Sequence, residues 1–319
     1  MVMLSRVANH IYWMARYLER AENTARLVSV NGTLILDLPR EARPSWLSLI
    51  AITGSIEGFR TRHPEDGETN VVRYLVSDER NSGSILSSIQ FARENARTIR
   101  DIIPREAWEQ INCLYLSSRT ALRGGLAPMR RSEELAQIIL AVQQISGILE
   151  GGMSHDEGYE FLHLGQNLER ADMTTRIIDV RCQDLAPEKA ELLRPFENIL
   201  WMSVLRSLTA YQMYRRHVQS QVRSDLVIRF LMCDAQFPRS LRYCLLAAKD
   251  CISRLPPCAT GLAALCPLLE ELDNADPETL GQSQLHEFID QVQIGLNQVH
   301  AALSGCYFGE VVGEEMASA

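Results

Sequence analysis

Apolar and small residues recur at steps of three and four along the first stretch of the chain. They fall at Ile11, Met14, Leu18, Ala21, Ala25 and Val28. The same spacing returns about 150 residues later, at Phe161, Leu164, Leu168, Ala171, Thr175 and Ile178. Because this period places such residues on one face of an α-helix, the pattern predicts two long helices that each bury one stripe.

The two predicted helices share more than their apolar stripe. Residues 18–26 read LERAENTAR, and residues 168–176 read LERADMTTR. Further matches follow in the same order, at offsets of 150 to 156 residues, and pair Trp46 with Trp201, Asp78 with Asp234, and Ser84 with Ser240. Ordered matches at a nearly constant offset are typical of internal repeats. We therefore predict a tandem, pseudo-twofold repeat of about 150 residues, with a first helical repeat at 1–150 and a second at 151–308, packed as one domain.

Breaks that contain glycine or proline divide each half into about five predicted helices. In the first half they span residues 5–37, 45–62, 83–102, 105–123 and 132–150. In the second half they span residues 156–184, 194–221, 238–254, 261–273 and 280–304. Residues 71–76 also fit a short strand, and residues 226–232 fit a strand or an extension of the preceding helix, but two short strands do not build a stable sheet. The prediction is an all-α helical bundle of about ten helices, followed by a loose acidic tail at 309–319.

The composition excludes several classes of protein. Hydrophobic residues make up 46% of the chain and charged residues 23%, as in globular domains. The net charge is −8 and no run of five basic residues occurs, which argues against a partner made of nucleic acid. No run of 18 apolar residues occurs either, so we expect no membrane span.

Two further observations bear on location. Charged residues run through the first 27 positions, where a signal peptide would need an apolar core. None of the eight cysteines has the C-x-x-C spacing of zinc ribbons and thioredoxin-like motifs. We therefore expect a cytoplasmic protein, with reduced thiols.

A charged cluster flanks the apolar stripe of both predicted long helices. Glu19, Glu22 and Arg26 share one flank of the first helix, and Glu169, Asp172 and Arg176 repeat them on the second. The second acid and the arginine of each set are four residues apart, which favours an ion pair along the helix. Ala15 and Gly165 lie one turn earlier, and such small residues let another backbone approach, so we expect half-buried carboxylates at a helix–helix contact.

Three interpretations of these clusters remain open. The first is a buried ion-pair network that sets the register of the helices. The second is a di-metal carboxylate site, but the Glu-x-x-His motif of such sites is absent, so we predict no metal and no cofactor. The third is a polar pocket for a carboxylate or phosphate, using Arg16 and Arg20 with Asn9, His10 and Trp13.

Common catalytic and nucleotide-binding motifs are missing from the sequence. It contains no G-x-x-x-x-G-K-[ST], no G-x-S-x-G, and no G-x-G-x-x-G after a predicted strand. An enzymatic activity of the chain itself is therefore left open, with no residue assigned as catalytic.

Several blocks of sequence together resemble the bacterial alpha-E domain family. They read LSRVANHIYWMARYLERAENTARLV, YLVSDERNSGSI, ARENARTIRD, LGQNLERADMTTRIIDV and FLMCDAQFPRSL, and they extend over nearly the whole chain. One departure is visible at residues 81–84, which read NSGS where the family pattern leads us to expect NPSS.

This resemblance implies an all-helical protein that works as an accessory or binding component. Its implied partner is a circularly permuted ATP-grasp amidoligase in a predicted peptide- or amide-bond-forming system, often with a transglutaminase-like protein. The motif members carried over as a candidate functional cluster are Arg6, Arg16, Glu19, Arg20, Glu22, Arg26, Glu169, Arg170, Asp172 and Arg176. Two alternatives are an enzyme in its own right that uses these Glu/Asp–Arg clusters, and a purely structural scaffold.

Overall fold

A computed structural model describes residues 3–123, 126, 128–184, 192–277 and 279–309. In this part of the chain there are fourteen α-helices and no strand, which confirms the all-α prediction. The first half contains α1 (Ser5–Asp37), α2 (Leu47–Ile52), α3 (Ile56–Arg60), α4 (Glu68–Val76), α5 (Ile85–Thr98), α6 (Arg105–Ala121) and α7 (Pro128–Gly152). The second half contains α8 (Glu157–Asp184), α10 (Glu197–Ser207), α11 (Tyr211–Val218), α12 (Ser224–Cys233), α13 (Leu241–Arg254), α14 (Ala259–Asn274) and α15 (Gln282–Leu303). The tail predicted at 309–319 lies outside the described residues, apart from residue 309.

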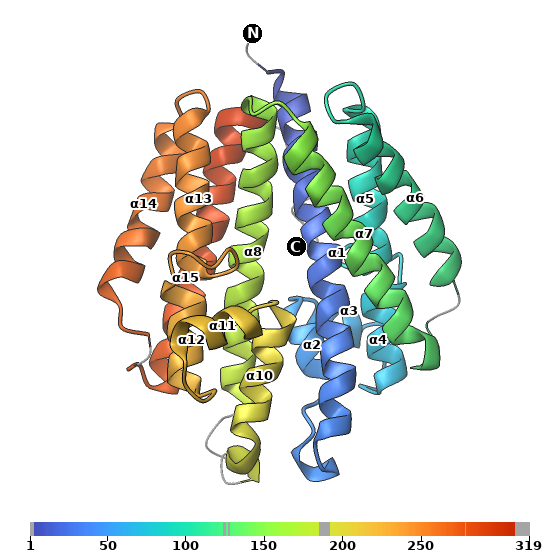
Figure 1. The fold of residues 1–319 in the computed structure, drawn as a ribbon, viewed down its shortest axis with the longest axis vertical. Coiled ribbons are helices and arrows are strands. Elements are labelled where there is room, and N and C mark those ends of the chain that lie inside the picture. Colours follow the sequence, from blue (N-terminus) through green and yellow to red (C-terminus); the bar gives the residue numbers. More distant parts are fainter. Residues whose placement is uncertain (1–2, 124–125, 127, 185–191, 278, 310–319) are drawn as a thin grey trace.

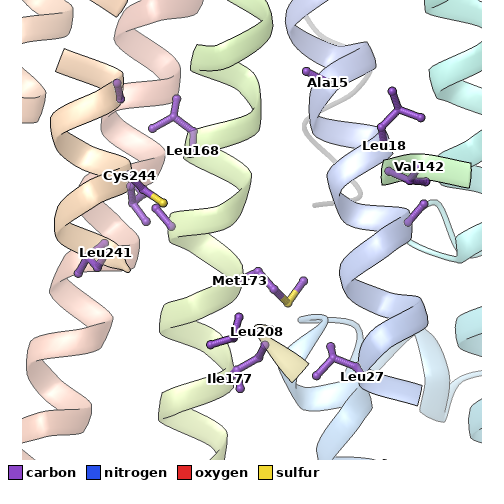
Figure 2. Packing of buried hydrophobic residues seen from close by; sticks show 14 of the residues in the cluster. Ala15, Leu18, Leu27, Val142, Leu168, Met173, Ile177, Leu208, Leu241 and Cys244 are labelled. Carbon is purple, nitrogen blue, oxygen red and sulfur yellow. The ribbon is translucent and has the colours of Figure 1, made fainter. Parts of the chain in front are cut away.

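The long helices α1 and α8 form the centre of the bundle (Figure 1). Helices α5, α6 and α7 lie on one side of this pair, and α13, α14 and α15 lie on the other (Figure 1). One hydrophobic core includes residues of both halves, among them Leu18 of α1 and Leu168 and Met173 of α8 (Figure 2). The short helices cluster at one end of the central pair.

A glycine allows α1 and α8 to approach each other closely. A Cβ atom added at Gly165 would lie 2.4 Å from the backbone oxygen of Tyr12, a distance that no real side chain adopts. The matched position on α1, Ala15, is also buried. The expected close approach at a small residue is therefore confirmed at Gly165, and it brings the charged flanks of both helices to one interface.

The structure has four helices more than the ten predicted, and three of the four arise where the chain turns through left-handed backbone. Gly54 (φ 69°) separates α2 from α3, Thr209 (φ 53°) separates α10 from α11, and Gln219 (φ 49°) ends α11. These turns split the predicted helices 45–62 and 194–221 and keep residues 226–232 in a separate helix, α12.

The strand considered at residues 71–76 is wrong, because these residues belong to α4. Its buried residues include Val71, Val72, Leu75 and Val76, whose spacing of one and four is that of a helical face. β-Branched residues favour strands only weakly, and packing of this face against the core outweighs that preference.

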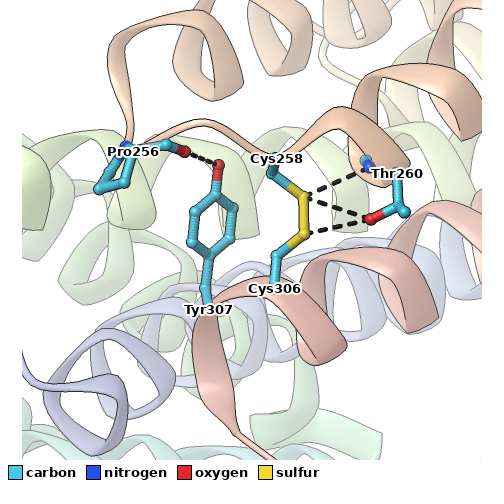
Figure 3. Close-up of a disulfide and its surroundings, with 6 residues drawn as sticks. Pro256, Cys258, Thr260, Cys306 and Tyr307 are labelled. Carbon is cyan, nitrogen blue, oxygen red and sulfur yellow. Dashed lines mark hydrogen bonds between the residues drawn. A yellow bond between two sulfur atoms is a disulfide. The ribbon is translucent and has the colours of Figure 1, made fainter.

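The expectation of fully reduced thiols is also wrong, because Cys258 and Cys306 form a disulfide (Figure 3). The two cysteines are 48 residues apart, a spacing that no short motif reveals. They meet because Cys258 precedes α14 while Cys306 follows α15, and these two helices pack against each other.

None of the helices in the described part of the chain is both long and apolar enough to cross a lipid bilayer.

Candidate functional site

Charged side chains connect the two central helices in a reciprocal way. From α1, Arg20 Nε donates to Glu169 Oε1 at 2.6 Å, and Arg16 Nε donates to Glu169 Oε2 at 2.8 Å. From α8, Arg170 Nε lies 3.1 Å from Glu19 Oε2. Both glutamate side chains are only 2% exposed. In each Glu-Arg pair, the arginine therefore reaches the buried glutamate of the other helix.

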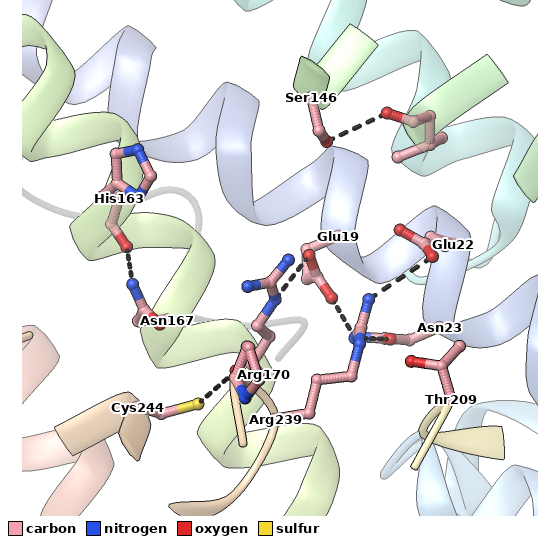
Figure 4. Close-up of polar contacts among 12 residues, drawn as sticks. Glu19, Glu22, Asn23, Ser146, His163, Asn167, Arg170, Thr209, Arg239 and Cys244 are labelled. Carbon is pink, nitrogen blue, oxygen red and sulfur yellow. Dashed lines mark hydrogen bonds and ion pairs between the residues drawn. The ribbon is translucent and has the colours of Figure 1, made fainter. Parts of the chain in front are cut away.

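A residue from far along the chain closes the cluster around Glu19. Arg239 stands in the turn before α13, and its Nη1 donates to Glu19 Oε1 and, at 2.9 Å, to Asn23 Oδ1 (Figure 4). Its Nη2 lies 3.4 Å from Glu22 Oε1, which also accepts a hydrogen bond from Arg26 Nε at 2.9 Å. Because the Arg239 side chain is only 8% exposed, it closes its own side of this ion-pair cluster to solvent.

The corresponding turn near Glu169 carries no long side chain. Ser84 caps α5 and Ser240 caps α13, so the residue before the cap is Gly83 in the first half and Arg239 in the second. A cavity of about 140 Å³ lies between Gly83 and Glu169, and both residues line it. Its other polar lining residues include Arg16, Arg20, Thr24, Asp172, Arg176 and His300.

The charges of this cavity are unequal. Asp172 accepts hydrogen bonds from Arg176 Nε at 2.9 Å with both carboxylate oxygens, and its side chain is 20% exposed. The arginine side chains that line the cavity outnumber its two carboxylates by one. A partly enclosed cavity with surplus guanidinium groups suits an anionic group, because arginine binds carboxylates and phosphates in a planar, bidentate geometry.

Both buried glutamates are held in the ionised form. Burial alone would raise the pKa of the Glu169 carboxyl, but Arg20 and Arg16 outweigh that effect and lower the pKa to about 2. The pKa of Glu19 is likewise lowered, because Arg170 and Arg239 outweigh its burial. Neither glutamate can therefore act as a general acid near neutral pH.

Aromatic groups support one wall of the cavity. The buried Tyr12 hydroxyl accepts a hydrogen bond from Arg16 Nη1 at 3.3 Å and lies 2.9 Å from His300 Nδ1. Burial, together with the charge of Arg16, lowers the pKa of His300 to about 4, so this imidazole is neutral at pH 7. The Arg16 guanidinium lies 5.0 Å from the centre of the Trp13 ring, a cation–π contact.

A second cavity, of about 380 Å³, adjoins Glu19. Its polar lining residues include Glu150, His163 and Arg170, and none of residues 237–240 lines it. His163 Nε2 lies 3.0 Å from Glu150 Oε2 at the wall, and burial lowers the pKa of His163. Of the two arginines that pair with Glu19, this cavity is therefore lined by Arg170 and not by Arg239.

Nine of the ten motif residues considered as candidates lie in the two clusters. The exception is Arg6, which is exposed in the first turn of α1 and does not line either cavity. Arg16 and Arg20 line the first cavity, as a pocket for an anion requires, whereas His10 hydrogen-bonds Asn95 at 2.7 Å and Asn9 does not line it. Trp13 does not line the cavity, and its ring packs against the Arg16 guanidinium.

Sequence reasoning missed two residues of these clusters. The sequence shows Arg239 only as part of a helix start, because its position gives no sign that the side chain crosses to a helix more than 200 residues away. His300 lies on α15 and contacts Tyr12 across 288 positions of the chain. The sequence did offer one signal for Arg239: the residue before the serine cap is glycine in the first half and arginine in the second.

A separate group of residues brings together possible metal ligands, although we predicted no metal. Asp179 of α8 and His286 and Asp290 of α15 place three such atoms within 4.8 Å of one another. His286 Nδ1 is 2.6 Å from Asp179 Oδ1, and this hydrogen bond raises the pKa of His286. The raised pKa favours a protonated histidine, so pairing of His286 with the two aspartates accounts for this geometry.

Comparison with known families identifies the chain. A domain named Alpha-E, described as a predicted alpha-helical domain with a conserved ER motif, matches residues 3–308. The chain therefore belongs to the Alpha-E family, as its sequence blocks led us to expect. Glu-Arg pairs occur in this chain at residues 19–20, 79–80 and 169–170, and the first and last of them lie at the interface of α1 and α8.

Similar proteins are found among mycobacteria. Uncharacterized protein Mb2597 of Mycobacterium bovis is 23% identical over 273 residues, which cover 79% of this chain and 30% of that protein. Uncharacterized protein Rv2567 of Mycobacterium tuberculosis shows the same identity and coverage. The chain thus spans about a third of the length of these relatives. No solved structure matches the chain.

Proposed function

We propose that this Alpha-E protein is a binding component that holds a carboxylate-bearing ligand in the cavity beside Glu169. The observation that carries the proposal is the surplus of arginine over carboxylate in a cavity of about 140 Å³ at the interface of the two central helices. Guanidinium groups aimed at a partly enclosed space form strong, charge-assisted hydrogen bonds with carboxylates.

A binding role fits the electrostatics better than an enzymatic role of the chain alone. A general acid near neutral pH needs a carboxyl with a raised pKa, and the pKa of Glu169 is lowered to about 2. The sequence also lacks the nucleotide-binding and nucleophile motifs that a self-sufficient ligase would need.

The proposed partner is an ATP-grasp amidoligase, as the family resemblance implies. In this scheme the Alpha-E protein presents an acidic or peptidic substrate, and the partner activates it with ATP and forms an amide or peptide bond. A transglutaminase-like protein is a further proposed partner. The tandem duplication belongs to the same proposal: one copy would keep an open cavity while the other gains an internal ion-pair cluster.

Co-expression with the ATP-grasp protein from the same gene neighbourhood tests this scheme. We expect the two proteins to co-purify, and we expect the rate of ATP hydrolysis by the partner to change when this chain is added. Arg176→Met, at the rim of the cavity, should reduce that change, whereas Arg105→Met, whose side chain is 85% exposed, should not. Absence of both the complex and the rate effect would leave a scaffold or an autonomous enzyme.

The cytoplasm is the proposed location, because the proposed partner consumes ATP. Fractionation of cells that express the chain, followed by immunoblotting, tests this location. We expect the protein in the cytoplasmic fraction, and recovery from another compartment would contradict the proposal.

A further inference from the structure

Gly83 and Arg239 stand at matched places before the caps of α5 and α13, and their difference indicates which chemical groups the open cavity fits. Thr174 Oγ1 of α8 donates a hydrogen bond to the Arg239 backbone oxygen at 2.8 Å. The second turn is thus fastened to α8, and the Arg239 side chain crosses from there to the acids Glu19 and Glu22 of α1.

In the first half, Gly83 stands where Arg239 stands in the second, so no side chain extends from that position toward the acids of the central helix. Gly83 and Thr24 of α1 line the cavity, and so do Glu169 and Asp172 of α8. Thr24 is the counterpart of Thr174, and it is 1% exposed. Its hydroxyl has no hydrogen-bond partner among the described residues, so a buried polar group faces the cavity.

The charge of Glu169 is balanced by two arginines of α1, and neither of them comes from the turn before α5. Where Glu19 pairs with Arg170 and Arg239, Glu169 pairs with Arg20 and Arg16. The position of α8 that matches Arg16 is Gln166, so the two halves supply the second arginine from different elements. The charge of Glu169 is therefore balanced while the cavity stays open.

Asp172 differs from its counterpart Glu22 in this respect. Glu22 pairs with both Arg26 and Arg239, whereas the described contacts of Asp172 are with Arg176. A cationic group that enters the cavity along the path of Arg239 therefore meets a carboxylate that can accept further hydrogen bonds. At the same time the guanidinium groups of Arg16 and Arg20, with five N–H donors each, line the same space.

We infer that the cavity binds a zwitterionic ligand of the amino-acid class, either a free amino acid or the end of a peptide. Its cationic group would lie at Asp172, as the Arg239 guanidinium lies at Glu22, and its carboxylate would lie on the arginines. This inference rests on the proposed function, which requires the carboxylate alone. A carboxylate for the cationic group and arginines for the carboxylate of such a ligand are both present in the cavity lining.

Calorimetric titration of the full chain with three probes tests the inference. L-Arginine carries both kinds of charge, agmatine carries the cationic groups without the carboxylate, and glutarate carries carboxylates without a cation. We expect L-arginine to bind about tenfold or more tightly than either of the others, because one additional charged hydrogen-bonding group contributes about that much.

Two substitutions locate the binding site. Gly83→Arg places on the first turn the side chain that the second turn carries, and a Cβ at Gly83 meets only Asn81 Oδ1, at an ordinary 3.5 Å. We expect this variant to lose about tenfold or more in affinity for L-arginine, since its side chain occupies the cavity. Gly67→Arg is the matched control, because Gly67 also precedes a helix and lies outside the cavity lining.

Asp172→Asn separates the cationic contact from the rest of the site, and it serves even where Gly83→Arg folds poorly. We expect it to weaken L-arginine binding by about fivefold or more and to leave glutarate binding no weaker than in the wild type. Equal binding of glutarate and L-arginine, unaffected by Asp172→Asn, would overturn the inference and leave the proposed function intact. If neither L-arginine nor glutarate binds, both the inference and the proposed function are overturned.

Discussion

The two charged clusters at the centre of the bundle use similar residues to opposite effect. Around Glu19, Arg239 from a distant turn makes a closed ion-pair cluster. Around Glu169, Gly83 stands before the matched helix cap and a cavity of about 140 Å³ remains. The residue before each helix cap thus differs: an arginine fills the space beside Glu22 in one cluster, and a glycine leaves the space beside Asp172 open in the other.

This difference indicates how each cluster should respond to substitution. Removing one partner from a buried ion pair is costly, because the remaining charge stays in a medium of low polarity. Removing one partner at the edge of an open cavity costs less, because water reaches the remaining charge. Loss of stability should therefore be large where a buried charge loses its partner and smaller at Asp172, which is 20% exposed in the open cavity, and loss of binding should concentrate at that cavity.

The largest expected effect is that of Arg239→Met. Met fills similar space, but it leaves Glu19 and Glu22 with one arginine fewer in a buried cluster, so we expect the free energy of unfolding to fall by about 3–4 kcal/mol. Urea denaturation measures this. Arg105→Met is the control, since both side chains of its ion pair with Glu109 are exposed, and it should cost less than about 0.5 kcal/mol. A loss of similar size in both variants would contradict the closed-cluster interpretation.

Glu169→Gln should cost about 3 kcal/mol at pH 7, because the carboxyl with a pKa of about 2 has an ordinary value of 4.5 in the unfolded chain. A lowered pKa means that the unfolded chain takes up the proton first as pH falls. The stabilisation is therefore complete above about pH 5 and is lost progressively toward pH 2.

Unfolding by urea at several pH values between 7 and 3 checks this prediction. The difference in stability between the wild type and Glu169→Gln should shrink as pH falls through this range, and Glu109→Gln, at an exposed ion pair, should show no such trend. A constant difference would mean that the effect of the substitution comes from packing and not from the charge of Glu169.

The main helices and the local ion pairs could be predicted because they depend on short spacings. The three-and-four period located α1 and α8, and the four-residue spacing indicated the pairs Glu22–Arg26 and Asp172–Arg176. The close approach at Gly165 could also be predicted, because a residue without a side chain on the flank of a helix leaves room for a neighbouring backbone.

The remaining features depend on residues that meet only in the folded chain. Thr209 adopts left-handed backbone without being a typical breaker, so the break after α10 was not visible. The Arg239 side chain crosses from the turn before α13 to α1, and Cys258 meets Cys306 at the ends of two packed helices. None of these features has a spacing that a linear pattern can reveal.

Gly165→Ala tests whether both clusters depend on the close approach of α1 and α8. The new Cβ would lie 2.4 Å from the Tyr12 backbone oxygen, so the helices must separate, at a cost of about 2–3 kcal/mol in unfolding free energy. Gly147→Ala is a matched control within α7, where a Cβ meets nothing within 4 Å. It should leave stability unchanged or raise it by about 0.5–1 kcal/mol. An equal response of both variants would show that the helices tolerate a wider spacing.

The smallest expected effect is the most direct comparison of the two clusters. Glu22→Ala removes a buried carboxylate that pairs with Arg26 and Arg239, and we expect a loss of about 2 kcal/mol in unfolding free energy. Asp172→Ala removes the matched carboxylate, which is 20% exposed at the open cavity, and water can solvate the remaining Arg176, so we expect a loss below about 1 kcal/mol.

The order of these two losses, measured by urea denaturation at pH 7, distinguishes the two roles. If Asp172 were a structural counterpart of Glu22, its removal would cost the same. A smaller loss at Asp172, combined with impaired binding of L-arginine by Asp172→Asn, would mean that the Asp172 carboxylate serves to bind a ligand. A carboxylate that adds little to the stability of the fold and much to the affinity for L-arginine acts through its contact with the ligand in the cavity.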